Sequence, residues 1–215
     1  MKHSVLVIGL GRFGSAAAHE LTTLGHEVLA IDSDEARVNE LAPHVTRALQ
    51  LDATDPDALR AVGAADFEHA IVAISDGVEA SVFATMALKE LGVGNVITKA
   101  GSRLHGSILA KAGADRVVFP EREMGQRVAH SFSVRDVVDY LDVAPDIGIV
   151  KLHPPASFLG RTFGELALES RLGLTPIALR RGVEVKVSPP PDTQIRDGDE
   201  LILIGRDEKL EQLDR

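Results

Sequence analysis

The sequence has 215 residues, of which 45% are hydrophobic and 26% are charged, and its formal net charge is −9. This composition is typical of a globular protein with enough apolar residues for one or two cores. The acidic balance, without any basic stripe, argues against a nucleic-acid partner. The absence of cysteine excludes disulfides, thiolate metal sites and cysteine nucleophiles.

No signal peptide precedes the first apolar run, and no apolar run approaches the roughly 18 residues that would span a bilayer. We therefore expect a cytoplasmic protein that reaches a membrane only through a partner.

Short apolar runs alternate with helical patterns over the first 120 residues. The predicted strands are Ser4–Ile8, Glu27–Ile31, Ala48–Asp52, Ala70–Ile74, Val96–Lys99 and Arg116–Phe119. The predicted helices between them are Ser15–Leu24, Asp34–Leu41, Asp57–Val62, Val78–Leu91 and Leu104–Ala112. Strands that are apolar at nearly every position are buried on both faces, as in a parallel sheet covered by helices. The pattern predicts an α/β fold with a doubly wound, Rossmann-like parallel sheet.

The pattern changes after residue 120. Glu121–His130 and Ser133–Leu141 are predicted as amphipathic helices, and Asp142–Gly148 has the composition of a linker. The elements predicted after it are a strand at Ile149–Leu152, a helix at Thr162–Ser170, and strands at Thr175–Leu179, Glu184–Val187 and Leu201–Ile204. We expect a nucleotide-binding domain at 1–120, crossover and dimerisation helices at 121–142, and a small α+β domain at 143–215.

The segment "VLVIGLGRFG" carries a G-x-G-x-x-G motif between the first strand and the first helix. Gly9 allows a tight turn, Gly11 lets a phosphate approach the backbone, and Gly14 lets the helix pack on the strand. The helix that follows offers unpaired N–H groups to phosphates. Asp32 ends the second strand, where a carboxylate accepts hydrogen bonds from ribose hydroxyls. Ser33-Asp34-Glu35 follow it without a nearby base, which disfavours NADP.

The sequence shows no catalytic motif that would indicate an enzyme. A dehydrogenase needs a domain that holds a substrate and supplies an acid–base group, and only about 65 residues follow the linker. The eight histidines (3, 19, 26, 44, 69, 105, 130 and 153) are scattered singly, without a pair at metal-ligand spacing, and we interpret them as surface or packing residues. No nucleophile has an evident base. We expect a binding protein rather than an enzyme.

The segments "VIGLGRFG", "GHEVLAID", "ADFEHAIVAI", "GADRVVFPEREMG" and "GDELILIG" closely resemble the Ktr/Trk-type potassium-uptake regulatory subunits of the RCK family. The resemblance covers essentially the whole chain. It implies a gating subunit that binds ATP or ADP, forms dimers arranged as an octameric ring, and regulates a membrane potassium transporter. The alternatives are an NAD(H)-binding oxidoreductase or redox sensor, and an RCK module of a potassium channel or another antiporter.

The resemblance also implies roles for individual residues. Arg12 would contact the terminal phosphate of ATP through charge-assisted hydrogen bonds, whereas a surface arginine at a helix start would oppose the helix dipole. Glu121, in "PEREMG", would hold Mg²⁺ or Ca²⁺ against the phosphates, or else act only as a favourable carboxylate at a helix N-terminus. The cofactor-binding positions are Gly9, Gly11, Arg12, Phe13, Gly14, Asp32, Ser33, Asp52, Ala53, Thr54, Ala73, Ile74 and Lys99.

A second ligand is implied for the C-terminal domain, because some members of the family bind cyclic di-AMP there. The matching positions are Arg171, Ile177 and Pro189, which would supply a cation for phosphate and apolar faces for a purine. The acidic "ALES" before Arg171 weakens this expectation. The alternative is a domain that only dimerises and docks.

Overall fold

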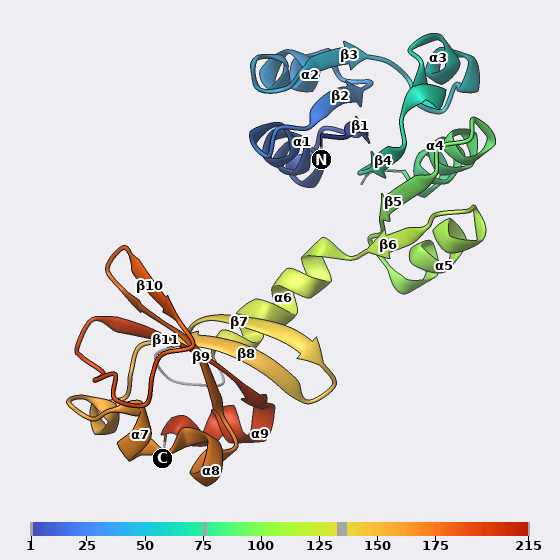
Figure 1. Cartoon of the computed structure of the whole chain (residues 1–215). Helices are drawn as coiled ribbons and strands as arrows, with labels where there is room; N and C mark the ends of the chain where they lie inside the picture. Colours follow the sequence, from blue (N-terminus) through green and yellow to red (C-terminus); the bar gives the residue numbers. More distant parts are fainter. Residues whose placement is uncertain (1, 75–76, 133–136, 215) are drawn as a thin grey trace. The chain divides into compact units, whose positions relative to one another are not determined.

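The computed structural model describes residues 2–74, 77–132 and 137–214 (Figure 1). The chain divides into two compact units, residues 1–121 and residues 122–215. Each unit contains one β-sheet. None of the described helices has the length and apolar character needed to cross a membrane.

The first unit is built from alternating strands and helices. They are β1 (Ser4–Ile8), α1 (Arg12–Thr23), β2 (Glu27–Asp32), α2 (Glu35–Leu41), β3 (Arg47–Gln50), α3 (Pro56–Ala61), β4 (His69–Val72), α4 (Val78–Glu90), β5 (Asn95–Lys99), α5 (Arg103–Lys111) and β6 (Arg116–Val118). The strands pair in parallel in the order β3-β2-β1-β4-β5-β6. This order confirms the predicted doubly wound sheet, with its reversal of direction between β1 and β4.

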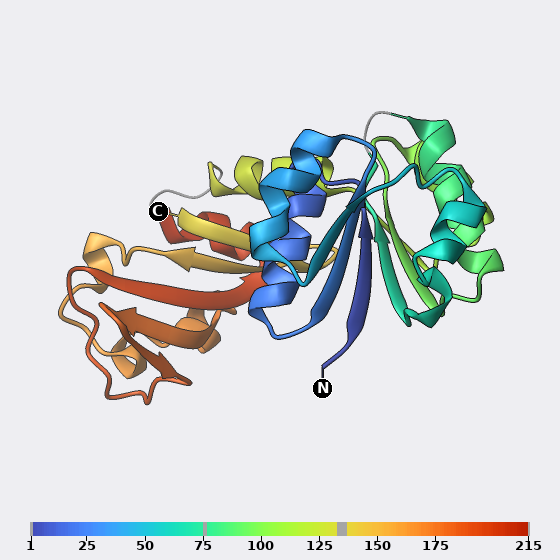
Figure 2. The same cartoon turned by 90° about the horizontal axis from the view of Figure 1, so that it is seen from above.

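Both faces of this sheet are covered by helices, so its strands are apolar on both sides (Figure 2). The face under α1 and α2 buries Val5, Val7, Ala18, Val28, Ala30, Val38 and Leu41. The face under α3 and α4 buries a second set that includes Leu6, Ile8, Leu29, Ile31, Leu59 and Leu88. Successive residues of β1 and β2 therefore supply two cores.

The second unit contains an antiparallel sheet with short helices, which confirms the predicted small α+β domain. Its elements are α6 (Pro120–Ser131, which begins at the end of the first unit), β7 (Val137–Ala144), β8 (Ile147–Leu152), α7 (Phe163–Leu166), α8 (Leu168–Leu172), β9 (Thr175–Arg181), β10 (Glu184–Val187), β11 (Asp199–Arg206) and α9 (Asp207–Leu210). The strand order is β10-β9-β11-β8-β7. Residues of α7, α8 and α9 pack with the sheet in one apolar core.

The prediction of a helix at Ser133–Leu141 followed by a linker at Asp142–Gly148 is wrong where the chain is described. Residues 133–136 lie outside the described residues, and Val137–Ala144 form β7, which pairs with β8 in a hairpin. Two register irregularities interrupt this pairing and disturb the alternation of apolar and polar residues that marks a strand. The tight turn between the strands uses Asp146 at a φ of 62°, a conformation that aspartate tolerates.

The predicted helix at Thr162–Ser170 is two helices. Thr162 and Glu165 form a capping box that starts α7. Ala167 then adopts a φ of 47°, in the left-handed region, and separates α7 from α8. Alanine is a strong helix former and rarely adopts this conformation. Local sequence therefore favours one continuous helix, and the packing of Phe163, Leu166 and Leu168 in the shared core accompanies the break.

Three cations and two carboxylates connect the central strands of the second sheet. Glu200 on β11 accepts hydrogen bonds from Arg180 Nε and Nη2, each at 2.5 Å, and its Oε2 lies 2.7 Å from Lys151 Nζ. The neighbouring Asp199 accepts from Arg181 Nε at 2.7 Å. Hydrogen bonds from Arg180 and then Lys151 lower the pKa of Glu200 to about 2.

The lowered pKa of Glu200 predicts acid sensitivity. Its stabilisation is fully present above pH 5, where the unfolded carboxyl is already ionised, and is lost as the pH falls towards 2. We expect Glu200→Gln to lower the free energy of unfolding by about 2 kcal/mol at pH 7 and by much less near pH 2. Denaturant unfolding across this range measures the difference. The exposed Glu208→Gln is the control. If the difference in free energy of unfolding between the wild type and Glu200→Gln does not shrink with acidification, the prediction is contradicted.

Candidate functional site

A cleft of about 900 Å³ opens at the carboxyl ends of β1–β4. Carboxyl ends of parallel strands share one edge of the sheet, and ligands of this fold bind there. Ten of the predicted cofactor positions line the cleft: Gly9, Gly11, Arg12, Asp32, Ser33, Asp52, Ala53, Thr54, Ala73 and Ile74. Phe13, Gly14 and Lys99 are not part of its lining.

The glycine turn is shaped by close backbone approach. Gly9 has a φ of 90°, and a Cβ on it would lie 2.8 Å from Ile74 N. A Cβ on Gly14 would lie 1.8 Å from Gly9 O. A Cβ on Gly11 would meet no protein atom within 4 Å, so this position faces open space in the cleft wall. Two of the glycines are therefore needed by the fold, whereas Gly11 leaves room for a ligand.

The first turn of α1 is electropositive. Gly11 is its N-cap and gives no side-chain hydrogen bond, and the first turn contains no acidic residue. The unpaired N–H groups and the helix dipole therefore favour an anion at this end. Arg12, the first residue of α1, is exposed and lines the same cleft. A phosphate-sized anion here would meet both the backbone donors and the guanidinium.

Asp32 is buried at the end of β2 and already holds the loops around it. Its Oδ2 accepts from Leu10 N at 2.6 Å, and its Oδ1 accepts from Asp34 N at 2.9 Å. A carboxylate has about four acceptor positions, so capacity remains for a ribose hydroxyl.

The expectation that no base lies near Asp32 is wrong. Arg37, in α2, places Nη1 3.5 Å from Asp32 Oδ2 and Nε 3.6 Å from Asp34 Oδ2, and it lines the cleft. Arg37 lies in the first turn of the helix that follows β2, and this position was the available signal, because that turn starts at the same sheet edge. Arg37 is half exposed and partly neutralises the two carboxylates.

The far wall of the cleft follows β3. Asp52 Oδ1 accepts from Thr54 N at 2.9 Å and from Thr54 Oγ1 at 2.7 Å. These two hydrogen bonds lower the pKa of Asp52. The closed Asp52–Thr54 turn presents Ala53 to the cleft as a small buried apolar surface.

Lys99 and Glu121 form an ion pair in the first unit. Lys99, at the end of β5, is buried, and its Nζ lies 2.6 Å from Glu121 Oε1. The hydrogen bond from Lys99 is the main cause of the lowered pKa of Glu121, and the charge of Arg12 adds to it. A cation held by Glu121 would have to share this carboxylate with Lys99 or displace it.

The second unit has a pocket of about 490 Å³ between α7, α8, β9 and the proline-rich loop. Pro189 lines it, together with Pro176 and Pro191. Arg171 and Ile177 are not part of its lining; Arg171 is exposed in the last turn of α8, and Ile177 is half-buried on β9. The structure thus brings one of the three predicted residues to this pocket.

The interpretation of the histidines as scattered is wrong in space. His3 and His69 meet at the amino-terminal edge of the first sheet, with ring centroids 5.1 Å apart. His19 and His44 also lie together, with centroids 5.6 Å apart. Sequence spacing could not show the first pair, because the parallel pairing of β1 and β4 brings together residues more than 60 positions apart, and the second pair joins α1 to the turn at Ala42–His44.

The sequence matches two domain families in succession: the TrkA-N domain over residues 5–120 and the TrkA-C domain over residues 147–215. The chain belongs to the Ktr/Trk-type RCK family. This RCK chain is 40% identical to the Ktr system potassium uptake protein C of Bacillus subtilis over 205 residues, covering 95% of this chain and 93% of the relative. It is 36% identical to protein A of the same system and organism over 208 residues, covering 97% and 94%.

Solved RCK structures share the fold. The GsuK RCK domain superposes with a TM-score of 0.70 at 18% identity, over 100% of this chain and 47% of that chain. A structure described as the GsuK channel bound to NAD has a TM-score of 0.69 at 19% identity, over 100% and 40%. At this identity the likeness establishes the fold of the RCK chain, and the family follows from the sequence matches.

The two glycine environments predict opposite responses to alanine. Gly14→Ala must move α1 away from Gly9 O, so we expect a loss of roughly 2–4 kcal/mol in the free energy of unfolding. Gly11→Ala adds a methyl group in open space at an extended φ of −69°, so we expect a change below about 0.5 kcal/mol. Thermal and denaturant unfolding of both variants measure this, and equal effects contradict it.

Proposed function

We propose that this RCK chain is a cytoplasmic, nucleotide-binding gating subunit of a membrane potassium transporter. The observation that carries the proposal is the cleft at the carboxyl edge, where the electropositive start of α1, Arg12 and Asp32 line one cavity. The relatives named as potassium uptake proteins match almost their whole length, which supports the transporter as the partner.

The proposed ligand is ATP or ADP. The start of α1 and Gly11 suit the phosphates, Asp32 suits the ribose, Asp52, Ala53 and Thr54 suit the adenine, and the Ala73–Ile74 backbone suits a floor beneath them. ATP and ADP end in a multiply charged phosphate that a guanidinium can contact, whereas the pyrophosphate of NAD is bridged to a second nucleoside.

NAD(H) is the alternative occupant of the same cleft. It would make the chain a redox sensor or an oxidoreductase, and Arg37 beside Asp32 removes the argument against a 2′-phosphate that rested on the absence of a base. Calorimetry with ATP, ADP, NADH and NADPH separates the ligands. Tighter binding of a nicotinamide dinucleotide than of ATP and ADP would overturn the gating proposal in this form.

Gating requires no chemical step. A ligand shifts a protein between two shapes only to the extent that it binds them with different affinity. Arg12 is exposed and lines the cleft. Its contact with a terminal phosphate is therefore the contact most able to differ between ATP and ADP. The same contact is also the most able to differ between two arrangements of subunits. We propose that this difference is transmitted to the transporter.

A divalent cation is proposed at Glu121. Mg²⁺ and Ca²⁺ prefer carboxylate and phosphate oxygens, and Glu121 is more than half exposed despite its bond to Lys99. If Glu121 and the nucleotide phosphates share the cation, Mg²⁺ or Ca²⁺ tightens ATP binding, and Glu121→Gln removes that gain. If Glu121 is only a helix-terminal carboxylate, calorimetry shows the same dependence of ATP affinity on the metal ion in the wild type and in Glu121→Gln.

Cyclic di-AMP is proposed as a ligand of the second unit. The pocket behind Pro189 has apolar proline walls that suit a purine. Arg171 would have to reach it from outside the lining, and Glu169 within the lining opposes phosphate. Titration of the full-length chain decides: binding abolished by Arg171→Ala supports the site, and a flat titration leaves a docking domain.

Arg12 generates the central prediction. We expect Arg12→Ala to weaken ATP binding at least tenfold and AMP binding less than about threefold, because AMP lacks the β- and γ-phosphates and so the group that Arg12 would contact. Isothermal titration calorimetry measures both. Arg103→Ala is the matched control, since Arg103 opens α5 as Arg12 opens α1 but lies outside the cleft. An equal loss for ATP and AMP contradicts the assigned role.

Assembly into dimers and an octameric ring is proposed from exposed apolar residues on helices. Phe83 and Met86 of α4 are 47% and 42% exposed, and Leu104 of α5 is 72% exposed. Met124 and Val128 of α6 are exposed as well, which suits the proposed dimerisation role of 121–142. Apolar groups of this kind mark subunit contacts.

Light scattering tests the assembly. We expect the wild type to be oligomeric at micromolar concentration and Phe83→Asp with Met86→Asp to lower the measured mass, because charges would be buried in the contact. Glu90→Lys, an exposed charge change at the end of α4, controls for charge alone. A monomeric wild type refutes the ring.

A further inference from the structure

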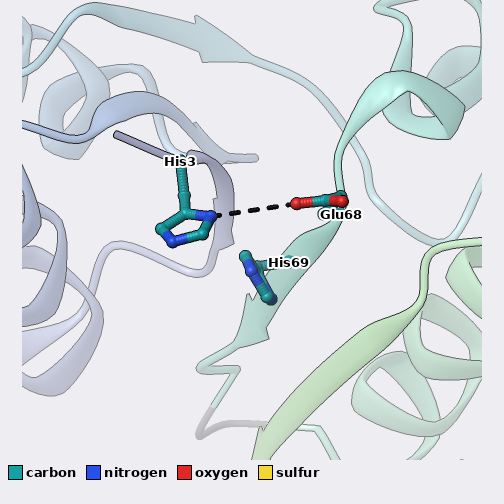
Figure 3. A group of neighbouring side chains, drawn as sticks. All are labelled: His3, Glu68 and His69. Carbon is teal, nitrogen blue, oxygen red and sulfur yellow. Dashed lines mark ion pairs between the residues drawn. The ribbon is translucent and has the colours of Figure 1, made fainter. Parts of the chain in front are cut away.

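Two histidines and a glutamate converge at the edge of the first sheet opposite the nucleotide cleft. His3 directly precedes β1, and Glu68 and His69 stand at the start of β4, which pairs with β1 in the register Val5↔His69. Each side chain offers one ligand atom, and these atoms lie within 4.8 Å of one another. Figure 3 shows His3 Nδ1 facing the Glu68 carboxylate, 3.8 Å away, with the His69 ring beside them.

Both histidines of the cluster have polar neighbours. The His3 backbone N–H donates to His26 Nδ1 at 3.2 Å, and the His26 ring lies 5.5 Å from the His3 ring. Asn95 Nδ2 lies 3.3 Å from His69 Nδ1, on the adjacent strand β5. The contact with Asn95 holds the orientation of the His69 ring, as polar neighbours do for the imidazoles of metal sites, whereas His3 is held through its backbone N–H. The backbone register of β1, β4 and β5 therefore positions the cluster, rather than flexible side chains alone.

We propose that His3, Glu68 and His69 bind a divalent transition-metal ion of the Zn²⁺ class. Two imidazole nitrogens and one carboxylate oxygen form a donor set that suits Zn²⁺ and its neighbours, whereas Mg²⁺ and Ca²⁺ prefer oxygen ligands alone. Ligand atoms around tetrahedral Zn²⁺ are about 3.3 Å apart, given bonds of about 2 Å. The present spacing of up to 4.8 Å must shorten on binding, through a rotamer change of the largely exposed Glu68 and adjustment of the imidazoles, and water completes the coordination.

The ion would act on the first unit without competing for the nucleotide. Ser4–Ile8 separates the cluster from the glycine turn, about 16 Å at the usual strand rise of about 3.3 Å per residue. β1 and β4 carry the cluster at their amino ends, and lead at their carboxyl ends to Gly9 and Ala73 of the cleft. Binding there ties two central strands together, so it should raise the stability of the unit.

The test uses the full-length protein without a polyhistidine tag, treated with a chelator and then exchanged into buffer with excess Mg²⁺. Calorimetry with Zn²⁺ should give one saturable equivalent and a higher melting temperature. His3→Ala and His69→Ala should each weaken binding at least about tenfold, and Glu68→Gln should weaken it less. His19→Ala is the control, because His19 and His44 also lie together but no third ligand completes a cluster among the described residues.

Two results would overturn the proposal. One is the absence of saturable Zn²⁺ binding by the wild type at about 100 μM; the other is equal binding by the wild type, His3→Ala and His69→Ala. Circular dichroism of the metal-free variants establishes that they are folded. Co²⁺ gives a second readout, since its visible absorption bands should appear with tetrahedral coordination in the wild type and in His19→Ala, and be lost in His69→Ala.

Discussion

The approach of α1 to the turn after β1 is the constraint on which the first unit depends. A single added carbon on Gly14 would lie 1.8 Å from the carbonyl oxygen of Gly9, and one on Gly9 would lie 2.8 Å from Ile74 N. These contacts bring three segments of backbone together where the sheet reverses direction, between β1 and β4. Because side chains are absent there, the N–H groups at the start of α1 open directly onto the cleft.

Charge is distributed unevenly around that cleft. Asp32 is buried, and its carboxylate accepts hydrogen bonds from two backbone N–H groups. These hydrogen bonds join the loops after β1 and β2. Arg37 lies against Asp32, while Arg12 is exposed at the start of α1. Lys99 is paired with Glu121 beside this region. Within the cleft lining, Arg37 is therefore paired with carboxylates, whereas Arg12 is exposed at the start of α1.

The parallel sheet separates two kinds of chemistry. Its carboxyl edge carries glycines, backbone donors and carboxylates that suit a nucleotide. Its amino edge gathers imidazoles and one carboxylate that suit a transition metal. In the second unit, the central strands are joined by Arg180–Glu200 and Arg181–Asp199 pairs, whose carboxylates are almost fully buried. The antiparallel register of β9 and β11 places Arg180 opposite Glu200 and Arg181 opposite Asp199, so the pairs help to define the register.

The sequence by itself determined the parallel sheet, its strand positions to within two residues, the glycine turn and most of the cleft lining, because apolar periodicity and glycine spacing are local signals. Only the tertiary structure decided the rest. The local pattern predicts helix and then linker over Val137–Ala144, where β7 forms, because register irregularities disturb its alternation. At Ala167 the helix breaks against the propensity of alanine. Arg37 beside Asp32, the Lys99–Glu121 pair, and the meeting of His3 with His69 depend on which strands and helices become neighbours. Such contacts between residues distant in sequence leave no local pattern to detect.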